Sequence, residues 1–431
     1  MSAQFILIPF VLLTLSFALA FAAAAVLVEI LARPYRKAAG VHWTERARLA
    51  FAPGSAVLWL AVALPPLAAV LGDVGLQTFD ERWQGTRLGW ALIWVAAVAG
   101  VMTVRYRWLR EVWGPRVTLR SWLSGCFFLA TSIIPHYAIL VLLVFSLPQT
   151  FGGRSVAVFG VGVLATAFFA CGGELLLLRW IGIARPASLS VPNMVERLAQ
   201  EMKVEGRIKV FELEWAQVNA AAWSARRAVG FSRPLLAVMN EDEVRAVAAH
   251  ELAHLTEPWW VRAVRVGQMF IYLPAAPLIK YGGMPGIAAG FLLFAGIAIS
   301  YRRFTRALEQ RADRLEHQAI ADGNAYLRSM IRLHQANLAP AVMPGAQTHP
   351  HLYDRLLAAG IQPEFARPNP PRQLGVMVAV FGFTILTLVL MGIVVIAAGV
   401  ALHFTTGWEP PLAQDPLAAA ATDPSSSHLR E

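Results

Sequence analysis

Long apolar runs constrain the fold of this chain most strongly. Six of them are long enough for a helix to cross the hydrocarbon core of a membrane, which takes about 20 apolar residues. They occupy residues 6–32, 49–71, 88–104, 122–147, 155–178 and 374–402. The first run has no basic residue before it and is too long for the apolar part of a signal peptide. Only 15% of the 431 residues are charged, against about a quarter in soluble domains, so we expect a multi-pass α-helical membrane protein.

A weaker apolar pair follows, at residues 266–279 and 284–300. Pro274 and Pro277 interrupt its first member, which is also short for a crossing. The pair is either a hairpin that crosses twice or a re-entrant segment that dips into the membrane and returns. Both versions bring the chain back to the side it left, so the sequence predicts between six and eight crossings.

Basic residues in the loops indicate the orientation. Residues 33–49 and 105–121 each carry five Lys or Arg, whereas the intervening loops are poor in them. By the positive-inside rule these two loops are cytoplasmic, so both termini lie outside. The interpretation is a protein of the cell inner (plasma) membrane with the lipid bilayer as a partner. The net charge of +10 comes mostly from Arg beside the apolar runs, so no nucleic-acid partner is expected.

The crossings divide the chain into segments with distinct roles. The predicted organisation is five transmembrane helices at 1–180, a cytoplasmic subdomain at 181–258, a membrane hairpin at 259–300, a cytoplasmic helical subdomain at 301–373, a last transmembrane helix at 374–402 and a disordered tail at 403–431. The tail is rich in Ala, Pro and Ser, a composition that cannot bury enough apolar surface to fold.

Between residues 188 and 256 the pattern becomes that of a soluble α+β domain. The predicted elements are an amphipathic helix at 194–204, a half-buried strand at 209–214 and extended segments at 218–223 and 234–238. Asn240 then stands at a helix N-cap, and Glu243, three residues on, completes a capping box. A helix is therefore expected to start directly after Asn240.

That helix carries the sequence His250-Glu251-Leu252-Ala253-His254. Residues i and i+4 lie on one helix face about one turn apart, so two imidazoles placed in this way can bind one zinc ion. Zinc acidifies a water molecule, and Glu251 is the candidate general base that takes the proton and later returns it to a leaving amine. The alternative is a helix with two interfacial histidines; the capped helix start before the motif favours zinc.

A catalytic zinc site needs a third protein ligand and one open position. A second polar helix contains Glu309 and Asp313, which are four residues apart and project from one face. We assign Glu309 as the ligand and Asp313 as a carboxylate that orients a zinc-bound imidazole. Glu316 and His317 are the rival ligands. The alternative for the whole segment is a solvated helix with charge pairs.

With these elements in view, the chain resembles the membrane zinc metallopeptidases that contain the HtpX-type proteases and the type I CAAX prenyl endopeptidases. Four stretches between about residues 190 and 360 carry the resemblance: Asn219-Ala220-Ala221-Ala222-Trp223, residues 236–255, Arg306 with Glu309 and Asp313, and Thr348-His349-Pro350 with Arg355-Leu356. HtpX-type proteins have fewer crossings than the five that precede the zinc domain here, and a prenylated substrate is not supported.

The resemblance implies a zincin-like domain that holds one zinc ion with His250, His254 and Glu309 and uses Glu251 in catalysis. It also implies that a protein or peptide substrate is added as a strand along Asn219, Ala220 and Ala221, since an exposed sheet edge binds extended peptides through their backbone. His349 or Arg355 would support the oxyanion of the tetrahedral intermediate. His349 is equally well explained as a loop residue.

Two other functions fit parts of the sequence. A metallopeptidase-type signalling receptor would carry a folded sensor after the last crossing, where about 28 residues of low-complexity tail stand. A catalytically silent membrane scaffold is the other, but Glu251 is present between its two histidines. His136 and Glu174 are ionisable residues inside apolar runs, where they are costly. They either line a water-filled cavity or, for Glu174, extend towards the cytoplasm.

Overall fold

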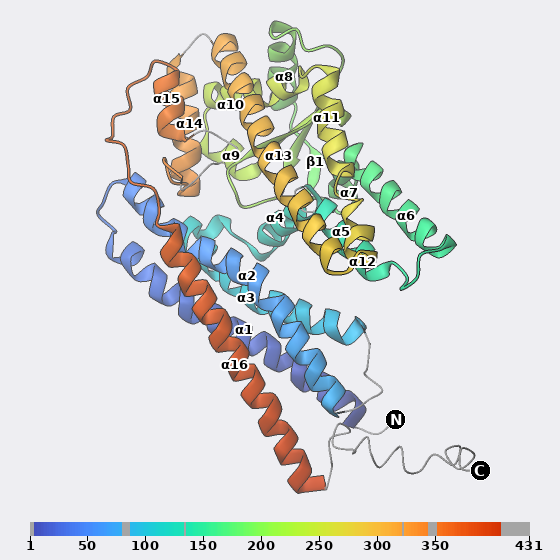
Figure 1. The fold of residues 1–431 in the computed structure, drawn as a ribbon. Helices are drawn as coiled ribbons and strands as arrows, with labels where there is room; N and C mark the ends of the chain where they lie inside the picture. Colours follow the sequence, from blue (N-terminus) through green and yellow to red (C-terminus); the bar gives the residue numbers. More distant parts are fainter. Residues whose placement is uncertain (1–3, 80–86, 133–134, 321–322, 344–350, 407–431) are drawn as a thin grey trace, which may run out of the picture. The chain divides into compact units, whose positions relative to one another are not determined.

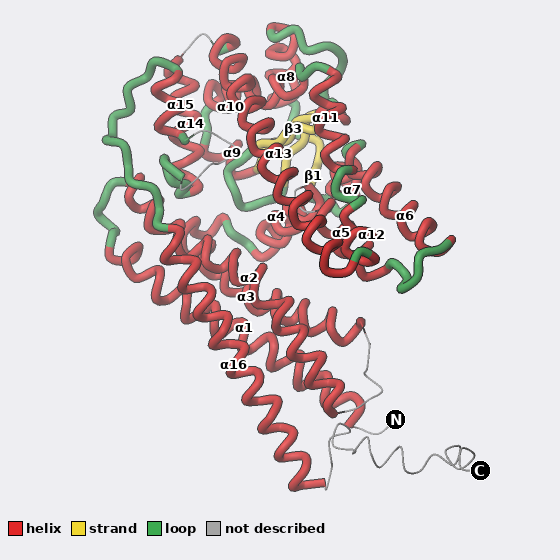
Figure 2. Tube along the Cα trace, in the orientation of Figure 1, coloured by secondary structure: helices red, strands yellow, loops and turns green. Residues whose placement is uncertain are grey.

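The computed structural model describes residues 4–79, 87–132, 135–320, 323–343 and 351–406, and it is mostly helical with one small sheet (Figures 1 and 2). This confirms the predicted combination of apolar helices with an α+β domain. The described residues group into two compact units, one within 1–40, 49–111 and 372–431, the other within 41–48 and 112–371. Of the tail predicted at 403–431, residues 403–406 form the end of helix α16 (Gln373–Thr406) and residues 407–431 lie outside the described residues.

The first unit consists of apolar helices. They are α1 (Gln4–Lys37), most of α2 (Trp43–Phe79), α3 (Arg87–Trp113) and α16 (Gln373–Thr406). A Cβ at Gly100 of α3 would lie 2.5 Å from the backbone oxygen of Phe17, so glycine is what lets α1 and α3 approach this closely. Near the other end of this contact, Arg36 of α1 donates to Glu111 of α3 at 2.7 Å.

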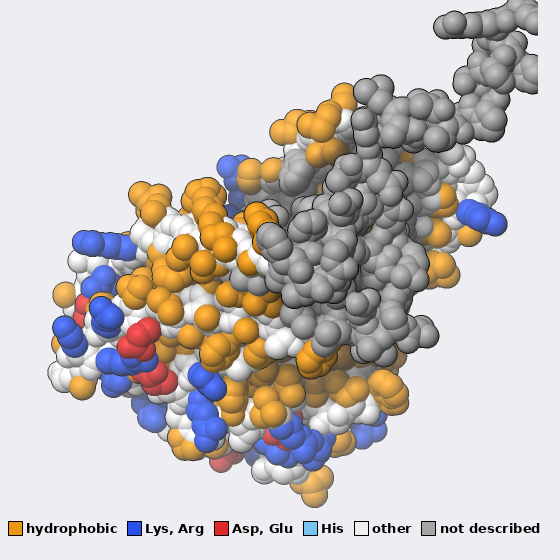
Figure 3. Space-filling model, turned by 90° about the horizontal axis from the view of Figure 1, so that it is seen from below, with side chains coloured by type: hydrophobic (Ala, Val, Ile, Leu, Met, Phe, Trp, Pro, Cys, Tyr) orange, Lys and Arg blue, Asp and Glu red, His pale blue; other side chains and the backbone are white. Residues whose placement is uncertain are grey.

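Six helices of the described part are long and apolar enough to cross a membrane, or seven spans if one bent pair counts as a single span. The six are α1, α2, α3, α16, α6 (Gly153–Ala170) and α13 (Gly283–Ala319). Hydrophobic side chains also cover much of the described part of the face drawn in Figure 3, which is unusual for a protein surface in water.

The run at 122–147, predicted as one crossing, consists of two helices. They are α4 (Leu119–Ser132) and α5 (Pro135–Ser146), and they are bent by 68°. Pro135, the first residue of α5, lacks an N–H and cannot continue a preceding helix. The run is therefore a broken span or a re-entrant segment.

The weaker apolar pair contains three helices. Its first member falls into α11 (Trp259–Phe270) and α12 (Ala275–Tyr281), and its second member is the first part of α13. A Cβ at Gly286 would lie 2.0 Å from the carbonyl oxygen of Leu278, so this glycine lets α12 pack along α13. No helix breaker separates the apolar part of α13 from its polar part, and the two predicted segments on either side of residue 300 form one continuous helix.

The sheet has four strands in the order β1-β2-β4-β3. They are β1 (Ala184–Pro186), β2 (Lys209–Leu213), β3 (Ala220–Trp223) and β4 (Ala228–Ser232). The pairs β1–β2 and β3–β4 are antiparallel, and β2–β4 is parallel. β3 therefore lies at one edge of the sheet.

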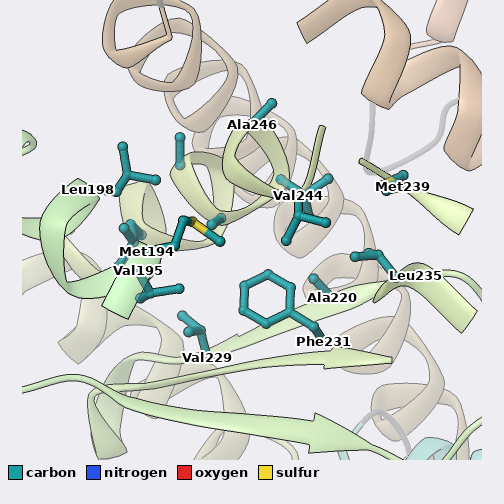
Figure 4. Packing of buried hydrophobic residues seen from close by; sticks show 14 of the residues in the cluster. Met194, Val195, Leu198, Ala220, Val229, Phe231, Leu235, Met239, Val244 and Ala246 are labelled. Carbon is teal, nitrogen blue, oxygen red and sulfur yellow. The ribbon is translucent and has the colours of Figure 1, made fainter. Parts of the chain in front are cut away.

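Short helices cover the sheet and complete the second unit. Besides those already named, they are α7 (Gly173–Trp180), α8 (Ser190–Glu201), α9 (Arg233–Val238), α10 (Glu241–Leu255), α14 (Gly323–Asn337), α15 (Leu352–Ala358), and the 3-10 turns η2 (Gly114–Arg116) and η3 (Ser224–Arg226). On one face of the sheet, Met194 and Leu198 of α8 and Val244 of α10 pack against Phe231 of β4 (Figure 4). On the other face, Leu178 of α7 belongs to a cluster with Phe211 and Trp223.

One extended prediction was wrong, and one strand was missed. Residues 234–238, predicted as extended, lie in the helix α9, because the Ser232 side chain caps it by accepting from the Leu235 N–H and Pro234 suits a first turn. The missed strand is β4, whose five residues are all buried. A central strand that is covered on both faces has no alternating pattern for a sequence to reveal.

Candidate metal centre

The helix that carries the two histidines begins where the sequence predicted. The Asn240 side chain accepts from the Glu243 N–H at 2.9 Å, and the Glu243 carboxylate accepts from the Asn240 N–H at 3.0 Å, which confirms the capping box. Glu243 is fully buried and also accepts from Arg332 of α14 at 3.1 Å. The start of α10 is therefore fixed both by local capping and by a contact with another helix.

A second helix fixes the other end of α10. Arg311 of α13 donates to the backbone oxygens of Ala253 and Thr256, both at 3.1 Å. These carbonyls belong to the last turn of α10, where a cation is favourable because carbonyls there lack helical partners. The contact sets the register between α10 and α13, which pack against each other along the site.

Three side chains from these two helices converge. His250 Nε2 lies 3.3 Å from Glu309 Oε2, and His254 Nε2 lies 3.7 Å from Glu309 Oε1. One ligand atom of each residue lies within 4.8 Å of the other two, and Glu309 is buried. Two atoms that each bind a tetrahedral zinc ion at about 2.0–2.1 Å are about 3.3 Å apart. The spacing and the two-histidine, one-carboxylate donor set both fit zinc.

The other ring nitrogen of His250 faces two more carboxylates of α13. His250 Nδ1 lies 3.1 Å from Glu316 Oε2 and 3.3 Å from Asp313 Oδ1. Burial acts to lower the pKa of His250, but Asp313, Glu309 and Glu316 outweigh it and hold that pKa well above its ordinary value. Such partners orient a metal-binding imidazole.

Asp313 is held in turn by Arg355 of α15. The Arg355 Nε donates to Asp313 Oδ2 at 2.9 Å, and a second guanidinium nitrogen donates to Oδ1. Burial acts to lower the pKa of Arg355, but Asp313 and the other acidic neighbours outweigh it and raise it above its ordinary value, so the guanidinium stays charged. This geometry indicates that Arg355 positions Asp313; the predicted contact of Arg355 with an oxyanion stays a prediction.

A second group of possible metal ligands shares His250. Its members are His250, Asp313 and Glu316. Glu316 is one of the two alternatives to Glu309 that the sequence analysis gave for the third ligand. The bidentate pair with Arg355 already neutralises Asp313, and that makes this group the poorer cation site. The other rival, His317, is exposed and lies beside the Tyr326 ring, 5.8 Å between centroids.

His254 has a partner that the sequence analysis missed. Its Nδ1 lies 3.1 Å from Glu257 Oε1, and Arg265 of α11 donates to the same oxygen at 2.6 Å. The Glu257 side chain is only 1% exposed, so this carboxylate is a buried support for the imidazole. The only hint in the sequence was that Glu257 follows His254 by three residues. Because α10 ends at Leu255, helical periodicity gave no reason to pair Glu257 with His254.

The predicted substrate strand lies beside the same helix. Ala220 and Ala221 belong to the edge strand β3, and Asn219 directly precedes it. The helix α10 packs against β3, and the Ser224 hydroxyl, just past the strand, donates to the backbone oxygen of His254 at 3.1 Å. Glu251 is half-buried on α10. His349 lies outside the described residues.

Two histidines on one helix and a carboxylate on a second, beside a small sheet with an open edge, define a metallopeptidase type of domain. Residues 188–360 match the model of peptidase family M48, and this confirms the resemblance to the HtpX-type proteases. The protein described as Protease HtpX homolog 1 of Saccharolobus solfataricus is 26% identical over 166 residues, which are 32% of this chain and 52% of that protein. The chain thus spans about half the length of the curated relative it matches. No solved structure is significantly similar.

Proposed function

We propose that this protein is a membrane-embedded, zinc-dependent endopeptidase. The observation that carries the proposal is the convergence of His250 Nε2, His254 Nε2 and the Glu309 carboxylate, at 3.3 and 3.7 Å, between two helices of a family M48 domain. These three residues would hold one zinc ion and leave one position open, which is the arrangement of catalytic zinc sites.

Zinc held by these residues would lower the pKa of a bound water molecule to about 7. The Glu251 carboxylate, next to His250 on α10, accepts a proton as the peptide carbonyl is attacked and returns it to the leaving amine. Glu316 accepts a hydrogen bond from His250 Nδ1, Glu257 accepts one from His254 Nδ1, and Asp313 lies 3.3 Å from His250 Nδ1. They thereby direct both Nε2 atoms to the same point and raise the basicity of the imidazoles.

A protein or peptide substrate would bind as a fifth strand beside β3. This edge strand carries only small side chains at Ala220, Ala221 and Ala222, so a peptide backbone can approach without displacing bulk. Its binding energy would come mainly from backbone hydrogen bonds, which any extended sequence can make. This mode of binding would admit any unfolded protein segment as a substrate.

The membrane arrangement is part of the same proposal. The six apolar helices and the bent pair α4–α5 support a multi-pass protein, and the Arg-rich loops at 33–49 and 105–121 support a cytoplasmic position for the metal centre. The site would then face the cytoplasm from the inner membrane, and both termini would lie outside.

The test compares the purified wild type with Glu251→Gln and with Glu241→Gln, a matched change at an exposed position of the same helix. We expect about one zinc per chain in all three proteins, since Glu251 is not a ligand. Cleavage of an unfolded protein substrate should fall by on the order of 100-fold or more in Glu251→Gln alone. Equal cleavage by wild type and Glu251→Gln would remove Glu251 from the reaction, and the absence of bound zinc would refute the metal centre.

A further inference from the structure

The edge strand β3 directs alternate backbone groups away from the sheet. The Ser232 N–H donates to the Asn219 oxygen at 2.9 Å, and the Asn219 N–H donates to the Ser232 hydroxyl at 3.1 Å, so both backbone groups of Asn219 face β4. Residues of this kind alternate along an antiparallel strand, so Ala221 and Trp223 also face β4. Val218, Ala220 and Ala222 therefore present their N–H and C=O groups to the open edge.

The first of these outward positions is already filled. The Val218 N–H donates to Asn337 Oδ1 at 2.9 Å, and Asn337 Nδ2 donates to the Val218 oxygen at 2.7 Å. One amide side chain thus satisfies both backbone groups of Val218, as the backbone of a neighbouring strand residue would. Val218 is fully buried, so while the Asn337 amide is in place no second chain pairs with its backbone groups.

The backbone around Asn337 is built to hold this amide in place. Asn337 is the last residue of α14, and Leu338 ends the helix in the left-handed region with φ 45°, which costs energy for a side chain that is not glycine. The Trp113 indole N–H donates to the Asn337 backbone oxygen at 2.8 Å, and Arg116 donates to the oxygen of Ala336. The end of α14 is therefore anchored independently of the amide itself.

At Ala220 and Ala222 the outward groups have no hydrogen bond to another segment within the part of the chain that the structure describes. Ala220 and Ala222 lie between two fixed points. At one end Asn337 binds Val218, and at the other the Ser224 hydroxyl donates to the His254 oxygen of α10. An extended peptide beside β3 can therefore pair with the backbone groups of Ala220 and Ala222, whereas those of Val218 are already bound to Asn337.

We propose that Asn337 acts as a stop for the substrate strand, which pairs with Ala220 and Ala222 and must turn away from the sheet at Val218. Asn337 is then a positioning residue that fixes which substrate residues pair with β3, and hence the register of the peptide relative to the metal centre. This inference rests on the proposed function, because it assigns a limit to the substrate site of that activity.

The test is a scan of N-methylated peptides. A peptide that the wild type cleaves, taken from an unfolded protein, is made with a single N-methyl group at each backbone nitrogen in turn, except the nitrogen of the scissile bond, which itself reacts. In the wild type, at most two positions, two residues apart, should lose roughly three- to tenfold in kcat/KM, the effect of one hydrogen bond. In Asn337→Ala, a third sensitive position should appear two residues beyond them, because the Val218 oxygen becomes free to accept.

Gln335→Ala is the matched control, since it removes an exposed amide two residues earlier on α14, and its map should equal that of the wild type. Zinc content and melting temperature report whether Asn337→Ala is folded. An unchanged map in folded Asn337→Ala would overturn the stop, and so would a third sensitive position in the wild type, whatever the variant does. If Glu251→Gln cleaves every peptide as well as the wild type does, or if no peptide is cleaved, the proposed function fails. That outcome is distinct from an unchanged map in Asn337→Ala.

Discussion

Arg355 and Arg367 offer a direct comparison of a buried and an exposed ion pair. Arg355 binds Asp313 with two nitrogens, and the two side chains are 9% and 15% exposed. Arg367 also binds Asp354 with two nitrogens, here Nη1 and Nη2, but its side chain and that of Asp354 are 49% and 37% exposed. Both pairs join an arginine to an aspartate and differ strongly in burial, so Arg355→Ala and Arg367→Ala test what the buried pair contributes.

Arg355→Ala leaves the Asp313 carboxylate buried beside Glu316 without its cation. Breaking a buried pair in this way costs about 3–5 kcal/mol, mostly because the remaining charge is not compensated. For a unit of this size each kcal/mol lowers the melting temperature by about 2–4 °C, so we expect a fall of about 6–20 °C. Arg367→Ala should melt close to the wild type, because water solvates the remaining carboxylate.

Zinc affinity gives the second readout of the same variants. Asp313 orients His250 only while Arg355 holds it, so Arg355→Ala should weaken zinc binding about 10- to 100-fold, the usual effect of losing such a support. Replacing both partners, in Arg355→Met with Asp313→Leu, should recover much of the melting temperature but not the zinc affinity. Melting in detergent and competition with a chelator measure the two effects. Equal losses in Arg355→Ala and Arg367→Ala would refute the reasoning.

Two further predictions test other parts of the proposal. Glu257→Gln should weaken zinc binding about tenfold, because a neutral amide supports His254 Nδ1 less well than a carboxylate. The control Glu201→Gln, at an exposed pair with Arg245, should bind zinc like the wild type. Equal zinc affinity of Glu257→Gln and the wild type would show that Glu257 does not support His254. A reporter fused to the carboxyl terminus should be active only outside the cytoplasm; a cytoplasmic signal would contradict the orientation taken from the Arg-rich loops.

Much of the fold was predictable because membrane crossing requires length and apolarity, which a single sequence displays openly. The break between α4 and α5 was not predicted, although Pro135 stands at the break, because the apolar content of residues 122–147 stays high throughout. β4 was missed because both of its faces are buried, and the start of α9 was misread although Ser232 and Pro234 form a helix-start signal.

In the candidate site, too, residues at helical spacing could be predicted from the sequence, whereas contacts between distant segments could not. His250 and His254, and likewise Glu309 and Asp313, stand at helical spacing, so each pair could be recognised from the sequence. Glu257 supports His254 only through a turn after the helix and a contact with Arg265 of α11. Asn337 and Val218 are 119 residues apart, and no periodicity connects them. Contacts of this kind depend on how the elements pack, which the sequence does not encode locally.

The placement of charge around α13 explains why the two clusters on His250 are not equivalent. Glu309, Asp313 and Glu316 stand at positions i, i+4 and i+7, so one helix face brings three carboxylates to a single imidazole. Such a cluster repels itself unless cations are added. Arg355 supplies one beside Nδ1, and the proposed zinc ion supplies the other beside Nε2.

The register set by Arg311 on the last turn of α10 makes this division possible. A shift of α13 by one turn, about 5.4 Å, would move Glu309 out of reach of both Nε2 atoms and bring Asp313, the partner of Arg355, into its place. Arg355 on the Nδ1 side of His250 and the proposed zinc ion on the Nε2 side therefore neutralise different carboxylates. They keep the ligand Glu309 and the supporting Asp313 in separate places, and loss of Arg355 should weaken zinc binding.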